Sequence, residues 1–113
     1  MIKAIFYRKS DGTYKGFSIS GHAMFGKYGK DIVCSAVSVL AINTVNSIDC
    51  LTDNQFDVEE DEDGGLLKFK FTSEPDKKGQ LLIESLALGI TDIKEEYGDK
   101  YLKVKFKDKS ETL

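Results

Sequence analysis

Apolar and polar residues alternate with a period of two in five short segments, and apolar residues recur with a helical period in two longer ones. The alternating segments span about residues 2–8, 15–20, 56–60, 67–71 and 102–107. The helical periods span about residues 32–51 and 82–97. The pattern therefore predicts the element order ββαββαβ.

Short polar segments that contain glycine join the strands of each pair. Residues 10–12 (Ser-Asp-Gly) separate the first two strands, and residues 61–65 (Asp-Glu-Asp-Gly-Gly) separate the third from the fourth. Each pair is therefore predicted to form a β-hairpin. Asp31 is in position to cap the N-terminus of the first helix, and Gly98 is in position to end the second.

Most of the predicted strands are apolar on one face only. This favours an α+β fold, a two-layer sandwich in which both helices lie on the same side of a mainly antiparallel five-stranded sheet. The first strand differs, because Ile5 and Tyr7 are apolar on its second face as well. A third layer or a subunit contact could cover them. Residues 1–113 are expected to form a single domain.

Composition narrows the classes of function. The chain has 113 residues and a net charge of −3, so a basic nucleic-acid-binding domain is not expected. We found no apolar stretch long enough for a membrane span and no signal peptide, and we expect a cytoplasmic protein. The acidic run at residues 57–63 suits a solvated turn, although it could also attract a basic substrate. The alternating lysines 103–109 suit the exposed face of an edge strand.

The two cysteines cannot pair if the first helix is real. Cys34 and Cys50 are 16 residues apart in the sequence, which on one helix is about 24 Å. A disulfide requires Cα atoms within about 7 Å. Two thiols and the single histidine, His22, also make a poor set of zinc ligands, so no metal site is expected.

Reactive side chains converge between His22 and Cys34. Cys34 falls in the first turn of the predicted helix, where unpaired N–H groups and the helix dipole favour a thiolate and could stabilise an oxyanion. The glycine-rich segment between them can fold back to bring the imidazole beside the sulfur. A nucleophile with a nearby base is the minimum for covalent acyl transfer. Asp31 could orient His22, cap the helix, or do both.

Other interpretations of these residues stay open. A free cysteine is usually a small hydrophobic residue of the core, and a histidine at the end of a strand is usually on the surface. A redox-sensing thiol would lack a resolving partner, because Cys50 is too far along the helix. The chain could also be a non-catalytic binding module with an incidental thiol.

Residues 21–23 (Gly-His-Ala) and 29–38 (Gly-Lys-Asp-Ile-Val-Cys-Ser-Ala-Val-Ser) resemble the paired motif of the Prp family. These are the ribosomal-processing cysteine proteases of Firmicutes and related bacteria. The resemblance covers essentially the whole chain. It implies that His22 is the catalytic base, that Cys34 is the nucleophile, and that Asp31 and Ser38 are further positions of the active site.

The resemblance also implies a substrate. Members of the family remove a short N-terminal extension from a large-subunit ribosomal protein, cut after a pair of aromatic residues, associate as homodimers and use no cofactor. Met24, Phe25 and Tyr28 could form an apolar substrate pocket, or they could simply anchor the segment to the core. As a hypothesis, this segment closes over the substrate as a lid, with hinges at Gly21, Gly26 and Gly29.

Overall fold

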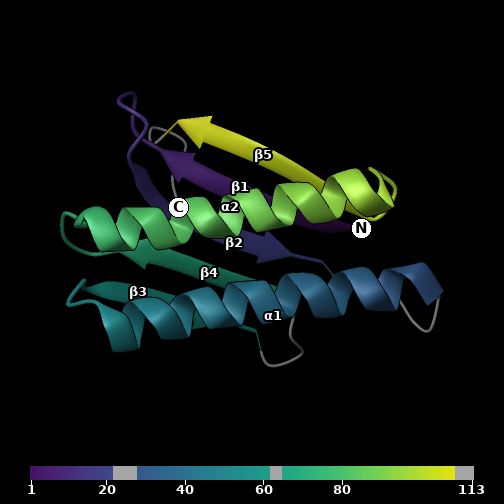
Figure 1. Ribbon diagram of the computed structural model, residues 1–113, viewed down its shortest axis with the longest axis horizontal. Coiled ribbons are helices and arrows are strands. Elements are labelled where there is room, and N and C mark those ends of the chain that lie inside the picture. Colours follow the sequence, from purple (N-terminus) through teal and green to yellow (C-terminus); the bar gives the residue numbers. More distant parts are fainter. Residues whose placement is uncertain (22–27, 62–64, 109–113) are drawn as a thin grey trace.

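The computed structural model describes residues 1–21, 28–61 and 65–108, and for residues 28–31 it describes only the backbone. The predicted order ββαββαβ is confirmed within these residues (Figure 1). The elements are β1 (Ile2–Arg8), β2 (Tyr14–Ser20), α1 (Tyr28–Leu51), β3 (Phe56–Glu60), β4 (Leu66–Phe71), α2 (Lys77–Tyr97) and β5 (Leu102–Asp108).

The five strands form one sheet in the order β3-β4-β2-β1-β5. Both predicted hairpins are present, because β1 pairs with β2 and β3 pairs with β4 in antiparallel orientation. β4 also runs antiparallel to β2, whereas β5 runs parallel to β1. The sheet is therefore mainly antiparallel, and the lysine-bearing strand β5 lies at one edge, as expected.

Both helices cover the same face of the sheet (Figure 1). Beneath them, Phe6, Phe17 and Phe69 are fully buried, and the rings of Phe17 and Phe69 stack with centroids 5.3 Å apart. On the opposite face, Tyr7 is only 8% exposed although neither helix reaches it. The two-layer α+β sandwich predicted from the pattern is thus confirmed.

Hydrogen bonds at both ends of α2 explain where this helix begins and ends. The side chain of Asp76 accepts a hydrogen bond from the backbone N–H of Gly79 at 2.9 Å. Gly98 has a φ of 92°, and its N–H donates to the carbonyl of Lys94 at 2.7 Å. The predicted stop at Gly98 is confirmed, since a positive φ there is a conformation that glycine adopts at little cost.

The first helix begins earlier than the sequence pattern predicts. α1 starts at Tyr28 rather than near Ile32, so Gly29 and Asp31 both lie inside it. The prediction that Asp31 caps the helix is therefore wrong. Gly29 lies in the helix and not in a loop, and its role as a hinge stays a prediction. Glycine costs a helix about 1 kcal/mol, but extending an existing helix needs no new nucleus and adds one hydrogen bond per residue.

α1 also corrects the expectation about membrane spans. By length and composition alone Ile32–Leu51 could cross a membrane, with 20 residues and a hydropathy of 1.5. In the fold one face of this segment lies in the core: Val33, Val37, Ala41 and Ile48 are each at most 2% exposed. These side chains belong to the hydrophobic core that α1 shares with the sheet and α2. Packing therefore accounts for one face of this segment, whereas Val39, Ile42 and Leu51 on its other faces are more than half exposed.

Candidate active site

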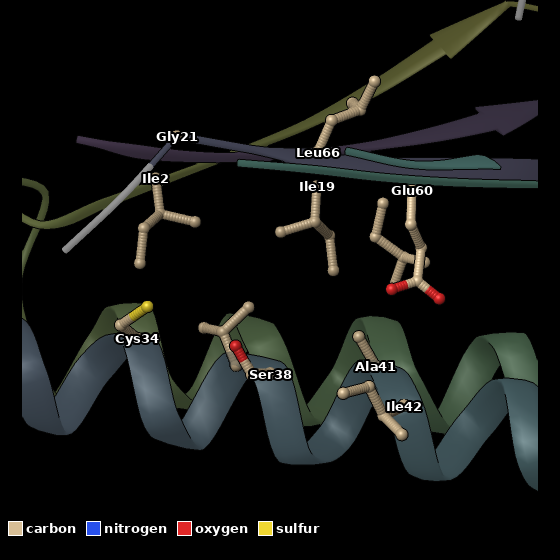
Figure 2. Close-up of a pocket in the computed structure, with 11 residues that line it drawn as sticks. Ile2, Ile19, Gly21, Cys34, Ser38, Ala41, Ile42, Glu60 and Leu66 are labelled. Atoms are coloured by element: carbon tan, nitrogen blue, oxygen red, sulfur yellow. The ribbon is translucent and has the colours of Figure 1, made fainter. Parts of the chain in front are cut away.

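A pocket lies between α1 and the sheet, at the end of the sheet where β2 finishes and β4 starts (Figure 2). Cys34, Ser38 and Ile42 line it from α1. The sheet contributes mainly apolar side chains, together with one carboxylate. The lining residues on the sheet side are Ile2, Ile19, Gly21, Glu60, Leu66 and Leu67.

Cys34 lies at one end of this pocket. Its thiol is free and half-buried, and Figure 2 shows the sulfur directed from α1 toward the sheet, on the side of Ile2. Cys50 is also free but is exposed further along the same helix. The prediction that the two cysteines do not form a disulfide with each other is confirmed. Of the two thiols, Cys34 is the one that a ligand in the pocket would contact.

Gly21 brings the other half of the sequence motif to the same pocket. Its N–H donates to the carbonyl of Gly65 at 3.0 Å, which holds the end of β2 beside β4. Its φ is +93°, and a Cβ at this position would overlap the carbonyl oxygen of Met1. Only glycine fits this backbone conformation and this space. Gly21, the last described residue before residues 22–27, therefore lies next to the pocket that holds Cys34.

Ser38 lies one helical turn beyond Cys34 and also lines the pocket (Figure 2). Residues four apart on an α-helix share a face, which is why both side chains reach the same space. The structure thus brings together Gly21, Cys34 and Ser38 among the predicted site residues. Its position makes the Ser38 hydroxyl available to a substrate bound at Cys34.

The remaining predicted site residues are not placed in the same detail. His22, Met24, Phe25 and Gly26 lie outside the described residues, and so do the predicted lid movement and the pairing of His22 with Cys34. Tyr28, Gly29 and Asp31 are placed by their backbone in the first turns of α1. The orienting role of Asp31 stays a prediction.

The early start of α1 changes the expected chemistry at Cys34. Cys34 is the seventh residue of the helix, not a residue of its first turn. Only the first four N–H groups of a helix lack an internal partner, so at the seventh position the amide donates within the helix. The prediction that Cys34 sits among unpaired N–H groups is therefore wrong. In the structure, the thiol of Cys34 is instead half-buried against the core and lines the pocket.

Glu60 is a residue of this pocket that the sequence analysis missed. It is the last residue of β3, and its carboxylate points from the sheet toward α1 (Figure 2). The sequence does indicate which way Glu60 points. Side chains alternate along a strand, so Glu60 must share the face of Phe56 and Val58. In the sequence analysis, Glu60 is considered only as part of the acidic run 57–63, either as a solvated turn or as a run that attracts a basic substrate.

The perturbed titrating groups lie elsewhere among the described residues. Burial, together with a hydrogen bond to Glu84, raises the pKa of Tyr14 to about 12. Tyr14 begins β2, and Gly21 follows the end of that strand, so the two are at opposite ends of it. No group of three or more His, Cys, Asp or Glu residues that could hold a metal ion occurs within the described part of the chain. The described side chains of the pocket therefore offer a thiol, a hydroxyl and a carboxylate.

Comparison with known proteins identifies the family. Residues 1–103 match the family described as "Cysteine protease Prp". This chain belongs to the Prp family. The ribosomal processing cysteine protease Prp of Bacillus subtilis (strain 168) is 33% identical over 103 residues, which cover 88% of this chain and 92% of the relative. The alignment thus extends over nearly the whole of both proteins.

Solved Prp structures have the same fold. Prp from Staphylococcus aureus in complex with a substrate peptide superposes with a TM-score of 0.87 at 27% identity, covering 95% of this chain and all of the other. The same protein with a covalently linked product peptide gives a TM-score of 0.86 at 28% identity, with the same coverage. A Streptococcus mutans protein, SMU.848, is 38% identical with a TM-score of 0.85, covering 96% of each chain. The Prp fold is therefore present here without large insertions or deletions.

Proposed function

We propose that this Prp-family cysteine protease is an endopeptidase that removes the N-terminal extension of a large-subunit ribosomal protein. One observation carries the proposal: a chain that matches Prp over residues 1–103 presents Cys34 in a pocket beside Gly21. Curated relatives are named ribosomal processing cysteine proteases, and a relative has been solved with substrate and product peptides. These findings favour a protease over a non-catalytic, ribosome-associated binding module.

The proposed chemistry is covalent acyl transfer. His22 takes the proton of the Cys34 thiol, and the thiolate attacks the carbonyl carbon of the residue before the cleaved bond. A C–S bond forms, and the carbonyl electron pair moves onto oxygen. As that pair returns, the C–N bond breaks, and protonated His22 gives its proton to the departing amine. Water then attacks the thioester with His22 as base, which releases the acid and regenerates the thiol.

The pocket supports this chemistry in two ways. Its lining is mostly aliphatic, which suits the apolar residues expected before the cleaved bond. Ser38, one turn from Cys34, can donate a hydrogen bond to the bound peptide. We further propose that Asp31 orients His22 and that the segment containing Met24, Phe25 and Gly26 covers the bound peptide.

Cleavage of a synthetic peptide tests the proposed function. The peptide should span the N-terminal extension of the ribosomal protein and the residues that follow it. Wild-type protein is expected to cut it after the aromatic pair, whereas Cys34→Ala should lose at least about 10³-fold in rate, because the nucleophile is gone. Mass spectrometry of the products gives both the site and the extent of cleavage.

Cys50→Ala is the matched control, because Cys50 is a free thiol on the same helix but lies outside the pocket. It should cleave at the wild-type rate. If folded, reduced wild-type protein leaves the peptide intact, the binding module becomes the better interpretation. If Cys34→Ala cleaves normally, the proposed nucleophile is wrong.

We also propose that the protein acts in the cytoplasm, where ribosomes assemble, and that it forms a homodimer. Both proposals follow from its membership of the Prp family. The face of the sheet that the helices leave uncovered is available for contact with another subunit, and it carries the partly exposed Ile5.

A further inference from the structure

The structure separates the acidic residues of β3 onto its two faces. Asp57 and Glu59 lie opposite Lys70 and Lys68 of β4, so each of these acids faces a lysine on the side of the sheet away from the helices. Glu60 has the other parity and lies opposite Leu67. Two of these three carboxylates thus have a cation beside them in the sheet, while the third faces the pocket.

Among the residues that the structure describes, no cation lines the pocket beside Glu60. Its neighbours in the pocket are aliphatic. Leu67 lies opposite it on β4, and Ile19, Ala41 and Ile42 line the same pocket (Figure 2). Among the described residues, no hydrogen bond or ion pair to its side chain is formed. Glu60 is exposed to solvent, and it stands beside the aliphatic wall of the pocket. A carboxylate without a partner attracts an arriving cation more strongly than one that already has a lysine beside it.

The length of the pocket sets how far this carboxylate lies from the chemistry. Cys34, Ile42 and Glu60 all line the pocket, and Figure 2 shows Cys34 at one end of it and the other two toward the opposite end. Eight residues along a helix correspond to about 12 Å. An extended peptide advances about 3.3 Å per residue, so this distance is spanned by three or four substrate residues.

We propose that Glu60 forms a subsite for a cationic side chain, and that it selects substrates with Lys or Arg three or four residues from the cleaved bond. The inference rests on the proposed function and specifies the substrate class of the same pocket. The aliphatic lining holds the residues between the cleaved bond and the cation. Glu60 is thus a specificity residue that acts in binding and takes no part in bond cleavage.

Paired peptides test the subsite. One set carries Lys at the third or fourth position on either side of the cleaved bond, and the matching set carries Gln there. Wild-type protein should have a KM about three- to five-fold lower for the Lys peptide at one of these positions, the range of a partly exposed ion pair. In Glu60→Gln the ratio of the KM for the Gln peptide to the KM for the Lys peptide should fall to near one. In Glu60→Lys the preference should shift to a peptide with Glu at the same position.

Glu59→Gln is the matched control, since it removes the same charge from the neighbouring residue on the other face of β3. It should keep the wild-type ratio. The subsite is overturned if no position shows a preference for lysine, if the ratio persists in Glu60→Gln, or if Glu59→Gln lowers it equally.

Binding without cleavage separates this inference from the proposed function. Fluorescence anisotropy of labelled Lys and Gln peptides is measured with Cys34→Ala and with Cys34→Ala/Glu60→Gln. A preference for lysine that depends on Glu60 supports the subsite whether or not wild-type protein cleaves. Absence of that preference, in a variant that binds the peptides, overturns the subsite while leaving the protease function intact.

Discussion

At the scale of single residues, Gly21 joins the fold to the site. A residue with a side chain would be destabilised here for two reasons. It would have to adopt a positive φ, and its Cβ would overlap the carbonyl of Met1. We expect Gly21→Ala to lower the free energy of unfolding by about 1–3 kcal/mol, measured by urea denaturation. Peptide cleavage should fall as well, because the backbone that leads to His22 must shift.

Gly12 provides the matched comparison for Gly21. Its φ is +90°, but a Cβ there would meet nothing within 4 Å. Gly12→Ala should therefore lower the free energy of unfolding only by the cost of a positive φ, about 1 kcal/mol, and should leave peptide cleavage unchanged. Equal losses of stability in the two variants would contradict the role assigned to the contact with Met1.

At the scale of elements, the start of α2 depends on a charged cap. Asp76 accepts hydrogen bonds from Asn54 Nδ2 at 2.8 Å and from the N–H of Gly79 at 2.9 Å, and the two hold the pKa of its carboxyl below the usual 3.8. A pKa that is lower in the folded state contributes stability above about pH 4, and this contribution is lost as the pH falls through the folded value.

Replacing the cap with a neutral one tests this linkage. Asp76→Asn keeps an oxygen that can accept from the N–H of Gly79 but cannot titrate. The loss of unfolding free energy between pH 7 and pH 3 should be smaller in Asp76→Asn than in the wild type, as measured by urea denaturation at both pH values. Asp92→Asn changes an exposed position of the same helix, and its loss of unfolding free energy between the two pH values should equal that of the wild type. An unchanged loss in Asp76→Asn would mean that the cap does not contribute to the acid sensitivity.

At the scale of the whole molecule, the asymmetry of the two layers bears on assembly. Both helices lie on one face of the sheet, which leaves the other face for solvent or for another subunit (Figure 1). We expect light scattering on a sizing column to give twice the 12.6 kDa mass of one chain. A single-chain mass that persists at micromolar and higher concentrations would rule out the proposed homodimer.

Much of the fold follows from the sequence by local rules. Alternation along Leu67, Phe69 and Phe71 determines which face of β4 is buried, and a glycine at position 98 ends α2 because it tolerates a positive φ. The paired motif around Gly21 and Cys34 pointed to the site and to the Prp family before any geometry was known. Each of these signals lies within a few residues of the feature that it determines.

Tertiary structure decided the rest, because the remaining features depend on contacts between distant segments. The parallel pairing of β5 with β1 joins opposite ends of the chain, and no local pattern encodes it. The start of α1 at Tyr28 passes through a glycine that local propensity treats as a break. The pocket exists only where α1 crosses the ends of β2, β4 and β3, and this crossing is what places Glu60 and Cys34 in one space.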